Sequence, residues 1–298
     1  MALEWFFLTL LSAAAYSVLD LIEKHLISAK IKNPLMLAIF VAIFYPINLA
    51  LIPLFFKIDL ALLPSALSFA IGAGMGIAYL LFMKAIRVEE ISRVVTLHYT
   101  YPLFIAPMAF FFLNEDLTTA NYIGILLLVV STFMVSYRGN GTRILYSPAL
   151  LLMTVLNIAI AIENILAKYL FDFTNSWSFI FWLTAGMVVI RMLLLFVPKV
   201  RKEFMAIQFR QLIGYGIAIS LLFLVANMFY YSAVSLQLVS LVSALSAVQP
   251  MFILAMAVAI LYLKPAFVSE ELSKKAVITK SIAVVLVFAG TYMITLNS

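Results

Sequence analysis

Residues 79–85, Tyr-Leu-Leu-Phe-Met-Lys-Ala, begin a pattern that occurs twice in this chain. The first copy continues with Tyr-Pro-Leu-Phe at 101–104 and Ser-Thr-Phe-Met-Val-Ser at 131–136. The second copy has Asn-Met-Phe-Tyr-Tyr-Ser-Ala at 227–233, Gln-Pro-Met-Phe at 249–252 and Gly-Thr-Tyr-Met-Ile-Thr at 290–295. The match aligns Pro102 with Pro250, and it indicates that the chain is an internal duplication.

The composition indicates a membrane protein. Of the 298 residues, 66% are apolar and only 11% are charged, whereas soluble domains use about 25% charged residues. Apolar runs long enough to span a bilayer occur about ten times, and only helices satisfy the backbone of such runs in lipid. Their approximate limits are 4–27, 35–56, 64–86, 93–113, 119–137, 148–171, 177–198, 211–234, 239–263 and 276–296. The predicted fold is an all-α membrane protein with ten transmembrane helices.

The duplication divides these runs into two five-helix units, residues 1–140 and 141–298. Because each unit holds an odd number of spans, the second unit must enter the membrane upside down. Inverted repeats of this kind are typical of secondary transporters. The glycines at Gly72, Gly74 and Gly76 are the clearest candidates for close helix packing.

The positive charges predict an orientation. Lysine and arginine gather in the loops after the odd-numbered runs, whereas the loops after the even-numbered runs carry only Lys57 and Lys168. Because cytoplasmic loops carry the excess of Lys and Arg, both termini are expected outside the cell membrane. The net charge of +6 therefore indicates membrane orientation, and nucleic acid is not expected as a partner.

Cofactors and metals are not expected. The chain has no cysteine and two histidines, which leaves few ligands for a metal centre. A phosphate-binding Gly-x4-Gly-Lys-Ser/Thr motif is also absent from the sequence, so direct coupling to ATP has no support.

Several motifs resemble those of the EamA-type ten-helix carriers of the drug/metabolite transporter superfamily. Tyr16-Ser17 with Lys24 eight residues after Tyr16 is similar to the opening motif of that family, and Lys168 repeats the lysine in the sixth run. Pro102-Leu-Phe followed by residues 113–118, Leu-Asn-Glu-Asp-Leu-Thr, resembles the family's ending of the fourth span. The resemblance implies export of small organic metabolites such as amino acids. Many relatives place both termini inside, which differs from the orientation predicted here.

Two polar helix faces are expected to line a shared pathway. Steps of three and four residues place Tyr16, Asp20 and Lys24 on one face of the first run, and Asn157, Asn164 and Lys168 on the matching face of the sixth. Polar stripes on spanning helices point into the bundle or towards water. The alternative for Asp20 and Lys24 is an ordinary ion pair near the end of the helix.

Glu163 lies deep in the sixth run (148–171), at least about two helical turns from either end. Because burial in apolar surroundings favours the protonated carboxyl, Glu163 is the main candidate for a proton-coupling group, with Asp20 as a second. The alternative is a structural glutamate. Arg191 could pair with Glu163, or its guanidinium could reach the membrane edge.

A third group of candidates surrounds the two prolines. Because proline removes the partner of the carbonyl four residues earlier, the backbone oxygens of His98 and Ser246 are expected to be unpaired. The surrounding rings and hydrogen-bonding groups suit an amphipathic, partly aromatic solute. The candidate solute-binding residues of this group are Tyr79, His98, Tyr99, Tyr101, Pro102, Asn227, Tyr230, Ser246, Gln249 and Pro250. The alternative for each residue is ordinary hydrogen bonding between helices.

The function hypothesis is a secondary transporter of small solutes that works by alternating access, either as a uniporter or by proton exchange. A flippase for polyprenyl-linked sugars or lipids shares this architecture and stays open as an alternative. An intramembrane enzyme is less favoured because the acids are scattered and the histidines are two. The expected partners are a small-molecule solute and the lipid bilayer, with the protein acting as a monomer or a homodimer.

Overall fold

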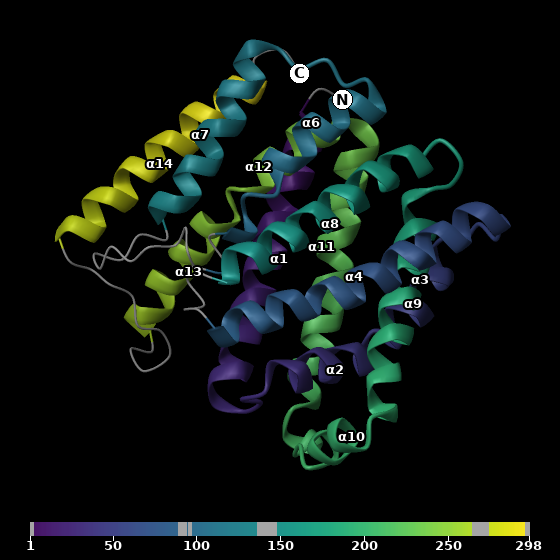
Figure 1. The fold of residues 1–298 in the computed structure, drawn as a ribbon. Helices are drawn as coiled ribbons and strands as arrows, with labels where there is room; N and C mark the ends of the chain where they lie inside the picture. The colour runs from purple at the N-terminus through teal and green to yellow at the C-terminus, as the bar shows by residue number, and fades with distance from the viewer. Residues whose placement is uncertain (1–2, 89–93, 95–96, 136–147, 264–273, 296–298) are drawn as a thin grey trace.

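A computed structural model describes residues 3–88, 94, 97–135, 148–263 and 274–295 of the chain (Figure 1). All the regular elements in this described part are helices. The first half holds α1 (Glu4–Ala29), α2 (Pro34–Phe44), α3 (Pro46–Phe55), α4 (Leu62–Val88), α6 (Pro102–Leu113) and α7 (Thr119–Val135). The second half holds α8 (Pro148–Leu170), α9 (Ser176–Leu193), η2 (Leu194–Phe196), α10 (Pro198–Met205), η3 (Phe209–Gln211), α11 (Ile213–Leu236), α12 (Val239–Ser246), α13 (Gln249–Leu263) and α14 (Lys274–Thr295).

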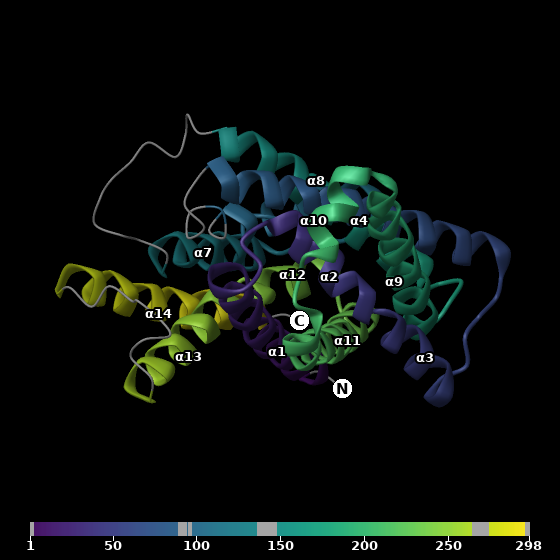
Figure 2. The same cartoon turned by 90° about the horizontal axis from the view of Figure 1, so that it is seen from below.

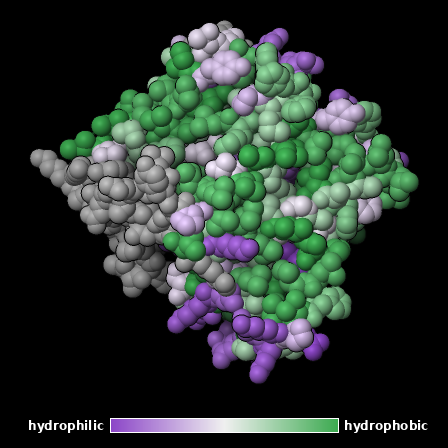
Figure 3. All heavy atoms as spheres, in the orientation of Figure 1, coloured by the Kyte–Doolittle hydropathy of each residue, from purple (hydrophilic) through white to green (hydrophobic). Residues whose placement is uncertain are grey.

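Helix length and hydropathy show a multi-pass membrane protein. Seven helical segments are long and apolar enough to cross a bilayer, and three shorter apolar helices accompany them in the described residues. Large apolar side chains are exposed along these helices, for example Phe111, Phe288 and Leu151. Figure 3 shows this apolar surface across most of the visible face. Such an exterior is stable in lipid, where apolar side chains need no cover.

Three of the predicted spans are broken in the structure. The second divides at Tyr45 into α2 and α3, and Pro46 begins the new helix. The fourth leaves helical geometry at residues 99–101, just before Pro102, and the ninth leaves it at residues 247–248, next to Pro250. Proline lacks the N–H that would continue the helical ladder, which explains why each break lies beside one.

Pairs of helices from the two halves of the chain pack together. Helix α1 lies against α11, and α8 lies against α4; α4 also packs on α9, and α11 on α2 and α3. Helix α7 lies beside α14 at one edge of the molecule, away from α3 and α9 (Figures 1 and 2). The core therefore forms between sequence-distant helices, with buried side chains such as Phe40 and Met153.

Glycines allow the closest of these contacts. A Cβ on Gly72 would lie 2.7 Å from the carbonyl carbon of Leu183 and closer still to its carbonyl oxygen, so α4 and α9 meet backbone to backbone. Gly74 has open space at the same position. Gly124 and Gly290 form the corresponding close contact between α7 and α14. The predicted packing through small residues is confirmed for Gly72, whereas Gly74 lies on the outer face of α4.

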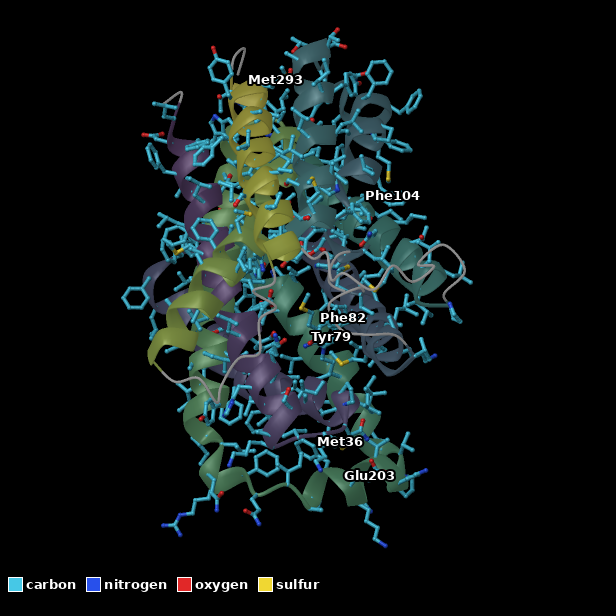
Figure 4. The ribbon with its side chains drawn as sticks, turned by 90° about the vertical axis from the view of Figure 1, so that its left-hand side faces the viewer. Met36, Tyr79, Phe82, Phe104, Glu203 and Met293 are labelled. Carbon is cyan, nitrogen blue, oxygen red and sulfur yellow. The ribbon has the colours of Figure 1, made fainter. Side chains whose placement is uncertain are left out.

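Charge concentrates at one end of the molecule. Helix α10 and its neighbours carry Lys199, Arg201, Lys202 and Glu203 on the surface, and Figure 3 shows hydrophilic residues at this end. Helix α1 begins and α14 ends at the opposite end (Figures 1 and 4). The long axis of the bundle therefore runs between a charged end and the end where the described chain begins and stops.

Candidate functional site

Asp20 of α1 connects two of the broken segments. Its Oδ2 accepts a hydrogen bond from Gln249 Nε2 at 2.8 Å and from the Tyr99 hydroxyl at 3.3 Å. Ser17, one turn earlier, donates from its hydroxyl to the Gln249 carbonyl oxygen at 3.2 Å. Asp20 therefore faces the bundle interior, where α1 meets the start of α13 and the break before α6.

Glu163 of α8 connects to α11. The Tyr231 hydroxyl donates to Glu163 Oε1 at 2.7 Å, and the neighbouring Tyr230 hydroxyl donates to Asn164 Oδ1 at 2.5 Å. Glu163 is 8% exposed, so its carboxyl is enclosed by protein. A hydroxyl can donate to a charged carboxylate and can accept from a protonated carboxyl. The Tyr231 hydroxyl can therefore stay bonded to Glu163 in either protonation state, as a proton-exchanging group requires.

Tyr16 of α1 lies within electrostatic range of both acids. Its half-buried side chain interacts electrostatically with both Glu163 and Asp20, and also with Tyr45 and Tyr101. The two predicted faces, one on α1 and one on α8, therefore approach a common region. Helix α1 packs mainly on α11 and helix α8 mainly on α4, and the role of the two faces in moving a solute stays a prediction.

A third acid, Glu23, was missed by the sequence reasoning. Its Oε2 accepts from the Tyr79 hydroxyl at 3.3 Å, and Arg191 of α9 lies over the Tyr79 ring with 4.5 Å between the guanidinium carbon and the ring centroid. Figure 4 shows Tyr79 and Phe82 on α4 between the two ends of the molecule. Glu23 lies three residues after Asp20 and seven after Tyr16, a spacing that could have placed it on the same face.

The sequence suggested that Arg191 either pairs with Glu163 or reaches the membrane edge, and the described part of the structure shows neither. It is 5% exposed, so it does not reach the membrane edge. Its neighbours are Tyr79, Tyr45 and the charge of Glu23, on the α1–α4 side of the bundle. Its interactions in the described chain do not include Glu163. Tyr45, which precedes the proline that breaks the second span, is another residue that the sequence reasoning missed.

The break before Pro102 is held by α8. Asn157 Nδ2 donates to the Leu97 carbonyl oxygen at 2.7 Å and to the Thr100 hydroxyl oxygen at 2.9 Å. The expectation of an unpaired His98 carbonyl was wrong, because that oxygen accepts from the Tyr101 N–H at 3.3 Å. The tighter turn before the proline replaces the lost helical bond with a shorter-range one. The buried His98 Nδ1 has no partner in the described chain.

Other candidates contact their own helices. Asn227 donates to the Phe223 carbonyl oxygen at 2.8 Å, and Ser246 donates to that of Val242 at 3.0 Å. Ser246 also hydrogen-bonds the side chain of Tyr101. Pro102 and Pro250 are buried beside the breaks. Lys24 is half-buried on α1. Its neighbour Glu23 is the acid of α1 that accepts a hydrogen bond from Tyr79 of α4.

Lys168 and Glu115 clamp the connection between α11 and α12. Lys168 Nζ donates to the carbonyl oxygens of Val234 and Gln237 at 2.7 and 2.9 Å, near the end of α11. Buried Glu115 accepts from the Val239 N–H at 2.7 Å and from the Ser240 hydroxyl at 2.7 Å, at the start of α12. Each charge faces the helix end of opposite partial charge. Lys168 therefore acts at a helix end in this structure.

Comparison with known proteins agrees with this arrangement. The chain is similar to a protein of known crystal structure, with a TM-score of 0.69 and 16% sequence identity. The match covers 97% of this chain and 96% of that chain. At this identity the similarity shows the fold alone. A search of curated proteins gives no significant match. The model of the EamA-like transporter family matches residues 3–137. The chain is therefore a multi-pass membrane protein whose residues 3–137 match the EamA-like transporter family of the drug/metabolite transporter superfamily.

Proposed function

We propose that this protein is a secondary transporter that moves small organic solutes across the cell membrane by alternating access. The observation that carries the proposal is the set of three acids, Asp20, Glu23 and Glu163, each hydrogen-bonded by a tyrosine from another segment inside an apolar bundle. Charged groups at this depth are costly by about 2.5–3.5 kcal/mol or more, so a purely structural core has no need of them.

The packing supports a division into two inverted five-helix units. The contact of α1 with α11 has its counterpart in that of α8 with α4, and the contact of α4 with α9 has its counterpart in that of α11 with α2 and α3. The break beside Pro102 in the first half likewise corresponds to the break beside Pro250 in the second half. The proposed boundary at 140/141 lies outside the described residues. Rocking of one unit against the other would open the site to each side in turn.

The solute site lies, in this proposal, between Asp20 and Glu163, where Tyr16 interacts with both. Broken helices border it at Tyr99 and Gln249. Segments that leave helical geometry expose polar groups and absorb changes of backbone angle more easily than continuous helices. Tyrosine rings around acids suit amphipathic solutes that carry a positive group, because ring faces attract cations.

The proposed driving force is the solute gradient or an exchange of solute for protons at Glu163. A carboxyl that is 8% exposed and bonded by a hydroxyl can bind a proton without losing that contact, because the hydroxyl both donates and accepts. The proposed net direction is export.

The decisive experiment is counterflow in proteoliposomes. Purified protein is reconstituted with an unlabelled solute inside, and uptake of the labelled solute is followed for a panel of amino acids and related metabolites. Tyr99→Phe removes one donor to Asp20 and should lower uptake, while Tyr122→Phe, an exposed residue on α7, should not. If no solute in the panel moves faster than in empty liposomes, the proposed function is wrong.

The proposed orientation places the α10 end in the cytoplasm. Because the chain has no cysteine, single cysteines report their surroundings without background. In intact cells, an impermeant thiol reagent should label Thr119→Cys at the start of α7 and should not label Lys199→Cys at the start of α10; the reverse pattern would invert the topology.

A further inference from the structure

Arg191 holds a positive charge deep in the bundle between two tyrosine rings. The distances from its guanidinium carbon to the ring centroids are 4.5 Å for Tyr79 and 5.9 Å for Tyr45. The Tyr45 side chain also hydrogen-bonds Arg191. Tyr79 comes from α4 and Tyr45 from the break between α2 and α3, so three segments fix the position of one guanidinium.

This guanidinium has unused hydrogen-bonding capacity. Its Nε, in a side chain that is only 5% exposed, has no hydrogen-bond partner in the described part of the chain. A guanidinium has five N–H donors, and a buried charge is stable only when it is paired and its donors are satisfied. Ring faces stabilise the charge, but the Nε–H still needs an acceptor.

The nearest acids are already engaged. Tyr79 interacts electrostatically with Glu23, Arg191 and Asp20, so positive and negative side chains meet at this ring. Glu23 accepts from the Tyr79 hydroxyl, and Asp20 accepts from Tyr99 and Gln249. The acids are thus held by donors of their own, and Arg191 keeps an unpartnered N–H beside them.

We propose that Arg191, with Tyr45 and Tyr79 as its supporting rings, is a carboxylate-binding subsite that determines solute specificity. The inference rests on the proposed transport function. A carboxylate accepts two parallel N–H bonds from a guanidinium, which is the geometry that a lysine or a neutral side chain cannot offer. The subsite selects solutes that bear a carboxylate over otherwise identical neutral amides, because a carboxylate accepts shorter and stronger charge-assisted bonds from the guanidinium than a neutral amide does.

The test uses solute pairs that differ only in this group: phenylalanine with phenylalaninamide, and leucine with leucinamide. Each pair is measured by counterflow and by the shift in thermal unfolding midpoint of the purified protein. Wild-type protein should prefer the carboxylates. Arg191→Gln should raise KM for the carboxylates by about 10- to 100-fold, the loss expected for one charge-assisted hydrogen bond, with little change for the amides.

Two further variants control the result. Arg191→Lys keeps the charge without the paired donors and should retain part of the preference, which shows that the fold tolerates changes at this position. Arg201→Gln removes an exposed arginine on α10 and should leave both KM values unchanged.

The outcomes separate the inference from the proposed function. Transport without a preference for carboxylates, or an unchanged preference in Arg191→Gln, overturns the subsite and leaves the transporter standing. A carboxylate-specific thermal shift that depends on Arg191, without counterflow, supports the subsite and overturns the transport function. If neither binding nor transport is found for any pair, both proposals are wrong.

Discussion

The contact between α4 and α9 predicts that replacing glycine by alanine has opposite effects on stability at two positions of α4. Gly72 and Gly74 are two residues apart on α4. A Cβ at Gly72 would lie 2.7 and 2.8 Å from the carbonyl carbon and Cα of Leu183, whereas a Cβ at Gly74 would meet nothing within 4 Å. Gly72→Ala should therefore destabilise the fold, and Gly74→Ala should stabilise it.

The magnitudes follow from two terms. Replacing glycine by alanine inside a helix contributes about 1 kcal/mol of stability at either position. At Gly72 the new methyl group lies nearly 1 Å or more inside the ordinary carbon–carbon separation of about 3.5–4.0 Å. The obstacle is backbone of α9, which cannot turn aside as a side chain can. Overpacking of this kind costs about 1–3 kcal/mol, occasionally more, so Gly72→Ala should lose up to about 2 kcal/mol net, and Gly74→Ala should gain up to about 1 kcal/mol.

The assay is reversible unfolding of the purified protein in mixed micelles with increasing sodium dodecyl sulfate, followed by circular dichroism. Gly186→Ala, which meets Ala73 N at 2.7 Å from the opposite side of the same contact, should behave as Gly72→Ala does. Equal stabilities for Gly72→Ala and Gly74→Ala would refute the backbone contact between α4 and α9 and the reasoning drawn from it.

Three further predictions concern polar side chains. Glu115→Gln should destabilise the protein by about 1.5–3 kcal/mol, because glutamine loses one acceptor and the charge at the start of α12; the same unfolding assay checks it, with exposed Asp116→Asn as the neutral control. Glu163→Gln keeps an acceptor for the Tyr231 hydroxyl but cannot titrate, so the pH dependence of counterflow should flatten, whereas exposed Asp172→Asn should leave it unchanged; an unaltered pH profile in Glu163→Gln would contradict the coupling role. Ser220→Ala removes a hydroxyl that donates to the Phe44 carbonyl oxygen at 2.9 Å beside the break between α2 and α3, and unfolding should show a loss of about 0.5–1.5 kcal/mol.

Much of the fold could be predicted from hydrophobicity alone. Apolar runs in lipid must be helices, since only the helix satisfies every backbone group within one segment. The prolines Pro102 and Pro250 also indicated where spans would be disturbed, because the missing N–H is a property of the residue itself. The extent of each break was not predictable, since the turn before Pro102 is held by a donor from a neighbouring helix: Asn157 of α8 donates to the Leu97 carbonyl oxygen.

The candidate site was predictable only in part. Periodicity placed Asp20 on an inward face, and the structure pairs it with Gln249 across 229 positions of sequence. Periodicity also allowed both Glu23 and Lys24 near that face, and the contact of Glu23 with Tyr79 decided which of them faces α4. The sequence offered two surroundings for Arg191, the membrane edge and Glu163, and Arg191 lies in neither.

The sequence by itself determined that this chain is helical, lies in a membrane and contains a repeated pattern, because these properties follow from the chemistry of consecutive residues. Only the tertiary structure decided which charges meet. The positions of Arg191 between two rings, of Glu115 at the start of α12 and of Gly72 against Leu183 depend on how helices far apart in the chain rotate and pack. That rotation is set by the summed contacts of all the helices, and no local pattern contains it.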